Sequence, residues 1–375
     1  MSIFDRVIDR HHTNSFKWDK YPKEVIPVWV ADMDFRAAPP ILEALDRVTR
    51  HGVFGYSRCP NALDEIMVER LRERHQWQVQ KEWFTWIGGL VPAIGFVIRA
   101  VTQPGEAVMT ATPVYHPFMI ETELADRELQ KVPLRLEGNR WTLDFEAIEK
   151  AITPDTKLFL LCNPHNPVGT MFRQDELWRL HQICHRHGII VCSDEIHCDL
   201  ILDASQKHIS YATLSPEAAQ ESFTLLAPSK TFNLAGLGCS VVVTPNDALR
   251  EKFVRAKAGL MPMLSAYAYE AALAAYRDGA EWHAELLEYL KGNHDYLLEE
   301  LNQLKGVQML PLEATYLAWV DMRGTGISDI AKRLEEAGVG VNDGSIFGQP
   351  GFVRINFACP RATLQEVVRR IKTIL

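Results

Sequence analysis

The sequence from residue 157 to residue 197 contains two apolar runs, each followed at once by polar and turn-forming residues. Residues 157–169 read KLFLLCNPHNPVG and residues 189–197 read IIVCSDEIH, with an amphipathic stretch at 174–187 between them. Short apolar runs that alternate with a helical stretch are typical of a parallel sheet covered by helices on both faces. This region therefore predicts two parallel strands joined by a helix.

The same alternation continues on both sides of this region. Further strands are predicted at 84–87, 107–110, 223–227 and 240–243, and a helix at 91–102. From about residue 264 the pattern changes to long helices such as 281–304, then strands near 316–321 and 352–357 and a last helix at 364–374. We predict an α/β protein with a mostly parallel large domain at 46–265 and a smaller α+β domain at 266–375. The N-terminal segment, 1–45, is expected to pack on the smaller domain.

Composition excludes several classes of protein. The 375 residues carry 40 basic and 48 acidic side chains, a net charge of −8, which argues against a nucleic-acid or anionic-membrane partner. No apolar run reaches the roughly 18 residues that a membrane span needs, and the N-terminus lacks the pattern of a signal peptide. Seven widely spaced cysteines suit free thiols in a reducing compartment. We expect a cytoplasmic protein that binds a small molecule.

Chemically useful residues follow four of the predicted strands. Gly88-Gly89 opens a helix after the first, where free N–H groups suit a phosphate, although a plain tight turn explains the glycines equally well. Asn166 lies in a rigid Asn-Pro turn, and Asp194 ends a buried strand, where it is either a helix cap or the partner of a cation. Lys230 follows the run FTLLA, where burial would lower its pKa, although most lysines are solvated surface residues.

These four sites carry more weight together than separately, because the carboxyl ends of parallel strands meet at one edge of a sheet. An aldehyde cofactor with a phosphate and a ring nitrogen would use all of them. Pyridoxal 5′-phosphate needs a lysine for its Schiff base, an acid for its ring nitrogen and a cradle for its phosphate. The combination predicts a pyridoxal-phosphate enzyme.

Five motifs extend this prediction to a family. They are WVADMDF at 29–35, DEIH at 194–197, SKTFNLAGL at 229–237, ATYLAW at 314–319 and RINFACP at 354–360. With these motifs the sequence resembles the fold-type I pyridoxal-phosphate enzymes of the class I/II aminotransferase superfamily, and more narrowly the MalY/PatB branch of cystathionine β-lyases, or C–S lyases. The resemblance covers essentially the whole chain.

The resemblance implies how the cofactor is bound. Lys230 matches the Schiff-base lysine and is the catalytic residue. The other implied cofactor ligands are Asp194 at the ring nitrogen, Asn166 at the phenolic oxygen, Tyr115 stacked on the ring, and Gly89, Leu90 and Ser229 at the phosphate. Two positions depart from many aminotransferases: His197, which we include among the cofactor-binding residues, stands where they have tyrosine, and Gly238 stands where they often have a phosphate-binding arginine.

The resemblance also implies how the substrate is bound and that a dimer forms. Arg354 resembles the arginine that grips the substrate α-carboxylate, and Ala31 begins a loop expected to touch the same group. Tyr56 resembles the tyrosine that reaches the phosphate from the neighbouring subunit, so we expect a homodimer.

Three functions remain open from the sequence. The first is a C–S β-lyase that converts cystathionine or a related S-substituted L-cysteine to pyruvate, ammonia and a thiol. The second is an aminotransferase with the same site, and the third is a cofactor-fold protein with a regulatory binding role. A metal site is not expected, because the cysteines and histidines between Cys184 and Cys198 do not have the spacing of a known zinc motif.

Overall fold

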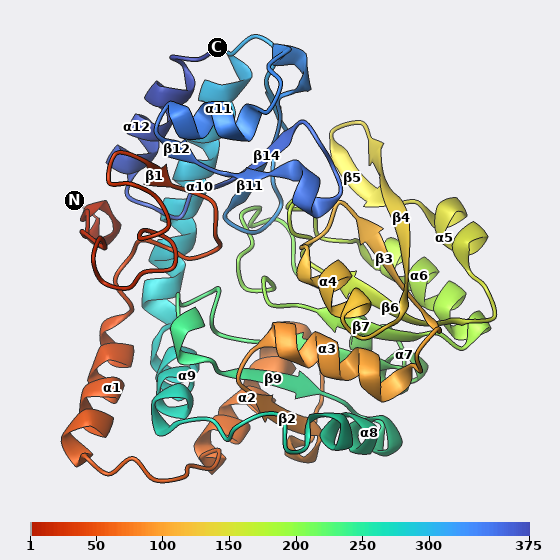
Figure 1. The fold of residues 1–375 in the computed structure, drawn as a ribbon. Coiled ribbons are helices and arrows are strands. Elements are labelled where there is room, and N and C mark those ends of the chain that lie inside the picture. Colours follow the sequence, from red (N-terminus) through yellow and green to blue (C-terminus); the bar gives the residue numbers. More distant parts are fainter. Residues whose placement is uncertain (1) are drawn as a thin grey trace.

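An eight-stranded sheet forms the centre of the larger part of the molecule (Figure 1). The structure, a computed structural model, describes residues 2–375. The strands run in the order β2-β9-β8-β7-β6-β3-β4-β5. Neighbours from β8 to β4 pair in parallel, whereas β9 pairs antiparallel with β2 and β8, and β5 pairs antiparallel with β4. The bounds are β2 (Phe84–Ile87), β3 (Ala107–Thr112), β4 (Glu128–Glu137), β5 (Arg140–Leu143), β6 (Thr156–Cys162), β7 (Ile190–Asp194), β8 (Ser222–Leu226) and β9 (Ser240–Val243).

Helices cover both faces of this sheet, which explains why most side chains of its central strands are apolar and buried. Successive side chains of a strand point to opposite faces. In β6, Leu158 and Leu160 pack in a core with α3 (Leu90–Val101) and α8 (Asp247–Lys257), whereas Phe159 and Leu161 pack in a second core with α6 (Gln174–His187). Shorter helices complete the layers: α4 (Pro117–Glu123), α5 (Phe145–Ala151) and α7 (Pro216–Gln220).

The second part of the molecule combines a smaller sheet with long helices. Its strands are β10 (Gln308–Met309), β11 (Leu317–Asp321), β13 (Asn342–Asp343) and β14 (Phe352–Asn356), in the antiparallel order β10-β11-β14-β13. The helices α10 (Ala280–Asn302), α11 (Ile330–Glu336) and α12 (Arg361–Ile371) share a core with this sheet.

The two ends of the chain lie in the same part of the molecule (Figure 1). The short strand β1 (Ile26–Pro27) pairs in parallel with β12 (Val339–Gly340), and the Phe4 ring lies 5.4 Å from Trp282. The helix α1 (Pro39–His51) packs along α9 (Ala266–Asp278), which also contacts α2 (Asn61–His75). These contacts are compatible with the expected domain division, which stays a prediction.

The predicted fold class is confirmed, and the predicted strands lie within two residues of the observed ones. The helices α1, α2 and α8 and the strands β4 and β5 were not predicted from the sequence, whereas α9 begins where the sequence predicts a change to long helices. Within residues 2–375, no helix is both long enough and apolar enough to cross a membrane.

Candidate active site

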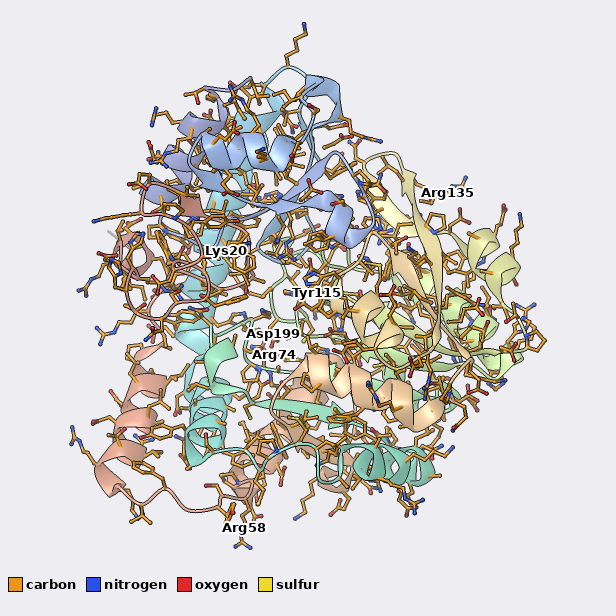
Figure 2. All side chains as sticks on the ribbon, in the orientation of Figure 1. Lys20, Arg58, Arg74, Tyr115, Arg135 and Asp199 are labelled. Carbon is orange, nitrogen blue, oxygen red and sulfur yellow. The ribbon has the colours of Figure 1, made fainter. Side chains whose placement is uncertain are left out.

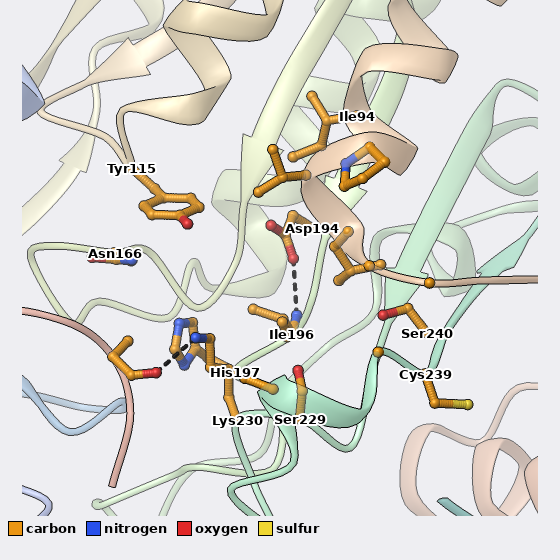
Figure 3. Close-up of a pocket in the computed structure, with 18 of the residues that line it drawn as sticks. Ile94, Tyr115, Asn166, Asp194, Ile196, His197, Ser229, Lys230, Cys239 and Ser240 are labelled. Carbon is orange, nitrogen blue, oxygen red and sulfur yellow. Dashed lines mark hydrogen bonds between the residues drawn. The ribbon is translucent and has the colours of Figure 1, made fainter. Parts of the chain in front are cut away.

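A cavity of about 190 Å³ lies at the carboxyl ends of the parallel strands, where the sequence places its polar residues (Figure 3). Asp194 is the last residue of β7, and Asn166 and Lys230 each follow the end of a strand by four residues. Nine of the predicted site residues line this cavity: Ala31, Gly89, Leu90, Tyr115, Asn166, Asp194, His197, Ser229 and Lys230. The fold therefore brings together, at one edge of the sheet, side chains from segments up to about 200 residues apart in the sequence.

Lys230 presents a buried amine to the cavity. Its Nζ donates a hydrogen bond of 2.7 Å to the carbonyl oxygen of Ala31 (Figure 3). Burial and the positive charge of Arg354 lower the pKa of the Lys230 amine to about 8, against the opposing influence of Asp32 and Asp194. A sizeable fraction of the amine is consequently neutral near neutral pH, and the neutral amine is the form that attacks carbonyl carbon.

Asp194 faces the cavity from the end of β7 (Figure 3). Burial, helped by the charge of Glu195, raises the pKa of its carboxyl to about 7. The Ile196 N–H, which donates to Oδ1 at 3.1 Å, opposes this shift and lowers the pKa. A buried carboxyl of this kind ionises fully only beside a cation. A protonated ring nitrogen is such a cation, so Asp194 suits the role predicted for it.

Asn166 is oriented by the buried guanidinium of Arg354. The Nη1 of Arg354 donates to Oδ1 of Asn166 at 2.9 Å, and its Nη2 donates to the carbonyl of Trp29 at 2.9 Å and to Oδ1 of Asn342 at 2.8 Å. Because arginine only donates, this contact identifies the oxygen of the Asn166 amide and leaves its NH₂ group as a donor for a ligand.

Arg354 keeps unused donors in this arrangement. Its Nε is buried without a partner, and three of its five N–H groups are engaged. Burial lowers the pKa of Arg354 to about 10, while the phenols of Tyr115 and Tyr316 raise it, so the group stays charged at neutral pH. A buried cation with free donors is suited to a carboxylate.

The glycine turn before α3 makes room for a ligand and for a second loop. Gly89 is the N-cap of α3, so the first N–H groups of that helix point toward the cavity that Gly89 and Leu90 line. Gly238 has φ +58°, and a Cβ atom there would lie 2.9 Å from the carbonyl oxygen of Gly88. A side chain at 238 would therefore require a strained backbone and a shift of Gly88 in this structure.

Two rings border the cavity beside these groups. The Tyr115 ring and the His197 side chain face the same space as Asp194 and Lys230 (Figure 3). Burial, Lys230 and Arg354 lower the pKa of His197 to about 3, so the imidazole is neutral, and its Nδ1 is buried without a partner. An unpartnered buried nitrogen that lines a cavity fits a ligand atom.

Tyr56 lies away from the cavity of its own chain. Its side chain is 97% exposed, and Arg58, two residues later, lies at the outer edge of the molecule, whereas Tyr115 is central (Figure 2). The large apolar side chains of Val53 and Phe54 beside it are also exposed.

Other residues of the site were missed from the sequence. Ser240 and Cys239 line the cavity, and Asn342 holds Arg354. Ser240 begins a predicted strand beside the glycine turn, a signal that would have identified it, whereas nothing local marks Asn342. Among residues 2–375, no group of three or more histidine, cysteine, aspartate or glutamate side chains could hold a metal ion.

A doubly covered sheet with a buried amine and a carboxyl at its strand ends, and an arginine from the smaller sheet beside them, defines an α/β enzyme site. The sequence pattern of the family described as aminotransferase class I and II matches residues 23–371, and the chain belongs to that family.

Individual relatives agree with this assignment. Cystathionine beta-lyase PatB of Bacillus subtilis (strain 168) is 38% identical and aligns over 99% of each chain. A crystal structure of OvoB superposes with a TM-score of 0.97 at 44% identity, covering 99% of this chain and 98% of that chain. Cystalysin from Treponema denticola, whose crystal structure contains a pyridoxal 5′-phosphate cofactor, superposes with a TM-score of 0.93 at 31% identity, covering 99% and 98%. The predicted family is confirmed.

Proposed function

We propose that this protein is a pyridoxal-phosphate-dependent C–S β-lyase that acts on cystathionine or related S-substituted L-cysteines. The observation that carries the proposal is the cavity lined by Lys230, Asp194 and Asn166, in a chain similar over its whole length to a cystathionine β-lyase. The buried guanidinium of Arg354 adjoins this cavity through its hydrogen bond to Asn166. The products are pyruvate, ammonia and a thiol.

The cavity fits the cofactor on several counts. The Asp194 carboxyl, with its raised pKa, matches the ring nitrogen, and the free amide NH₂ of Asn166 matches the phenolic oxygen. The unpartnered Nδ1 of His197 leaves a further polar atom for a ligand. Gly89, Leu90 and Ser229 would hold the phosphate, and the Tyr115 ring would stack on the pyridine. When bound, the cofactor supplies an electron sink for the negative charge that develops on the substrate Cα.

The protein's own groups would carry the remaining work. Lys230 Nζ would hold the cofactor through its aldehyde carbon, and the free amine would accept the proton from Cα of the substrate. Arg354 would hold the α-carboxylate with its free donors. Asp194 would keep the ring nitrogen protonated. Loss of the Cα proton would let the Cβ–S bond break, so that the sulfur leaves as a thiolate, and water would convert the remaining three-carbon fragment to pyruvate and ammonia.

We also propose a homodimer in which Tyr56 reaches the phosphate of the neighbouring subunit. The exposure of Tyr56, Val53 and Phe54 on one loop supports this arrangement, because an apolar surface of this kind suits burial against a second copy. The seven cysteines are all free thiols, which supports a cytoplasmic location.

A product assay tests the proposed reaction. Purified protein loaded with pyridoxal phosphate is incubated with L-cystathionine, and pyruvate and free thiol are measured, with the Lys230→Met variant as the control. We expect equal amounts of pyruvate and thiol from the parent and neither from the variant. A keto acid without free thiol would instead indicate an aminotransferase, and bound cofactor without either product would favour a regulatory role.

A further inference from the structure

Basic side chains near the N-terminus converge on two carboxylates of the Trp29–Phe35 loop. Arg10 pairs with both carboxylate oxygens of Asp32, at 2.8 and 3.0 Å, and with Oδ1 of Asp34 at 2.9 Å. Lys17 donates to Oδ2 of Asp34 at 2.8 Å and to the carbonyl of Asp32 at 2.9 Å. Trp18 donates its Nε1–H to Oδ1 of Asp34 at 2.7 Å.

The charged groups at the centre of this network, Lys17 and Asp34, are almost fully removed from water. The Lys17 side chain is 0% exposed and that of Asp34 is 3% exposed, whereas Arg10 and Asp32 are about one quarter exposed. Charges are withdrawn from water at a large cost unless each one is paired and hydrogen-bonded. The interactions therefore restrict the loop to one conformation.

The same loop touches the catalytic lysine. The carbonyl of Ala31 accepts the hydrogen bond from Lys230 Nζ and a second one, of 3.3 Å, from the Tyr316 hydroxyl. Asn233, three residues after Lys230, accepts from the Met33 N–H at 3.0 Å and donates to the Met33 carbonyl at 3.0 Å. The loop and the lysine segment are thus locked to each other.

The hydrogen bond to Ala31 also orients the amine. A neutral amine that donates one hydrogen to a fixed carbonyl has its lone pair directed away from that carbonyl. Since Ala31 and Lys230 both line the cavity, the position of the carbonyl decides where the lone pair of Lys230 is available.

We propose that Arg10 and Asp32 are positioning residues for Lys230: their ion pair fixes the loop that carries the Ala31 carbonyl, and this carbonyl orients the amine. Neither side chain touches the substrate or cofactor in this scheme. The inference rests on the proposed function only in treating Lys230 as the catalytic amine.

The signs of the expected effects follow from the charges that face Lys230. These are Arg354 from β14, Asp194 from β7 and Asp32 from the Trp29–Phe35 loop. His197, from the turn after β7, also faces the amine, but its imidazole is neutral. Removing the negative charge of Asp32 makes the protonated amine less stable, whereas removing the positive charge of Arg10 makes it more stable. Loosening of the loop alone would admit water and favour the protonated amine in both variants.

The test measures the reactivity of Lys230 in the cofactor-free, full-length protein. Trace acetylation by acetic anhydride is quantified at Lys230 by peptide mass spectrometry across a range of pH. At pH 7 we expect acetylation about threefold faster in Asp32→Asn and about threefold slower in Arg10→Gln than in the parent. Arg10→Lys keeps the charge and should lie close to the parent. Arg333→Gln, which removes an exposed arginine paired with Glu336 at 3.1 Å, is the matched control and should not differ.

Two results would overturn the proposal: unchanged Lys230 reactivity in both variants, or a shift toward slower acetylation in both.

A second measurement applies to the holoenzyme, in which Arg10→Gln should lower kcat for cystathionine at least threefold while KM stays within about twofold. An equal change in kcat in the Arg333→Gln control would also count against it. Failure of the proposed lyase reaction would leave the acetylation result interpretable, because that experiment uses neither cofactor nor substrate.

Discussion

Replacing Glu195 by leucine should lower the stability of the folded protein, because it removes a carboxylate that four buried hydrogen-bonding groups contact. Glu195 is 0% exposed. Its Oε1 accepts from Ser193 Oγ at 2.8 Å, Ser210 Oγ at 3.1 Å and the Tyr211 N–H at 3.0 Å, and its Oε2 lies 2.9 Å from His208 Nε2. Although burial raises the pKa of Glu195, the charge of His208 and the hydrogen bond with it lower that pKa below its usual value.

The size of the effect follows from the number of donors left without a partner. An unsatisfied buried polar group costs about 1–3 kcal/mol. Two of the four donors are hydroxyls that can rotate, so we take the lower end and expect a loss of about 4 kcal/mol. At about 2.1 cal/mol/K per residue, a chain of 375 residues has an unfolding entropy of about 0.8 kcal/mol/K. The Glu195→Leu variant should therefore melt about 5 °C below the parent.

Thermal unfolding of the cofactor-free protein, followed by circular dichroism, measures this difference. The Glu195→Gln variant is the control, because its carbonyl oxygen can still accept from the three donors at Oε1, and it should lose less than half as much. A leucine variant that melts within about 1 °C of the parent would refute the reasoning, as would a glutamine variant that falls equally far.

Four further predictions concern the site and its pH dependence. Gly238→Ala should lower the melting temperature and weaken cofactor uptake measured by absorbance, because it combines a left-handed φ, costing about 1–2 kcal/mol, with a clash against Gly88. Uptake of pyridoxal phosphate by the cofactor-free protein should accelerate as pH rises through about 8, where the Lys230 amine loses its proton; a rate that is flat from about pH 6 to pH 9 would contradict the buried amine. Arg354→Lys should raise KM for cystathionine at least tenfold in a pyruvate assay, because it loses the planar donor pair, and an unchanged KM would rule out the carboxylate role. The difference in stability between the parent and Glu195→Leu should narrow as pH falls below about 4.5. The pKa of Glu195 is lowered in the folded state, so its ionised form stabilises the parent and protonation removes that stabilisation. Melting curves of both proteins from about pH 7 to pH 4 measure this narrowing.

The central strands and the residues behind them were predictable because their signals are local. Strands covered on both faces are mostly apolar, so runs such as 158–162 are visible without knowledge of the fold. The strand β4 was missed because its sequence, ELQKVPLRLE, is mostly polar, has only two buried positions and contains a proline. The helices α1 and α2 were missed because their buried faces are narrow, with two and three fully buried side chains.

The α/β class, the order of the strands along the chain, and the asparagine, aspartate and lysine at their carboxyl ends could be predicted from the amino-acid sequence. They follow from periodicity and turn chemistry within short segments. The folded structure was needed to show that Arg354 orients Asn166 across 188 residues and that a side chain at Gly238 would clash with Gly88. It also shows that Arg10 and Asp32 belong to the loop whose Ala31 carbonyl accepts from Lys230. Those contacts depend on how the strands are ordered in the sheet and how the N-terminal segment folds back. No local pattern encodes a distance between segments that far apart.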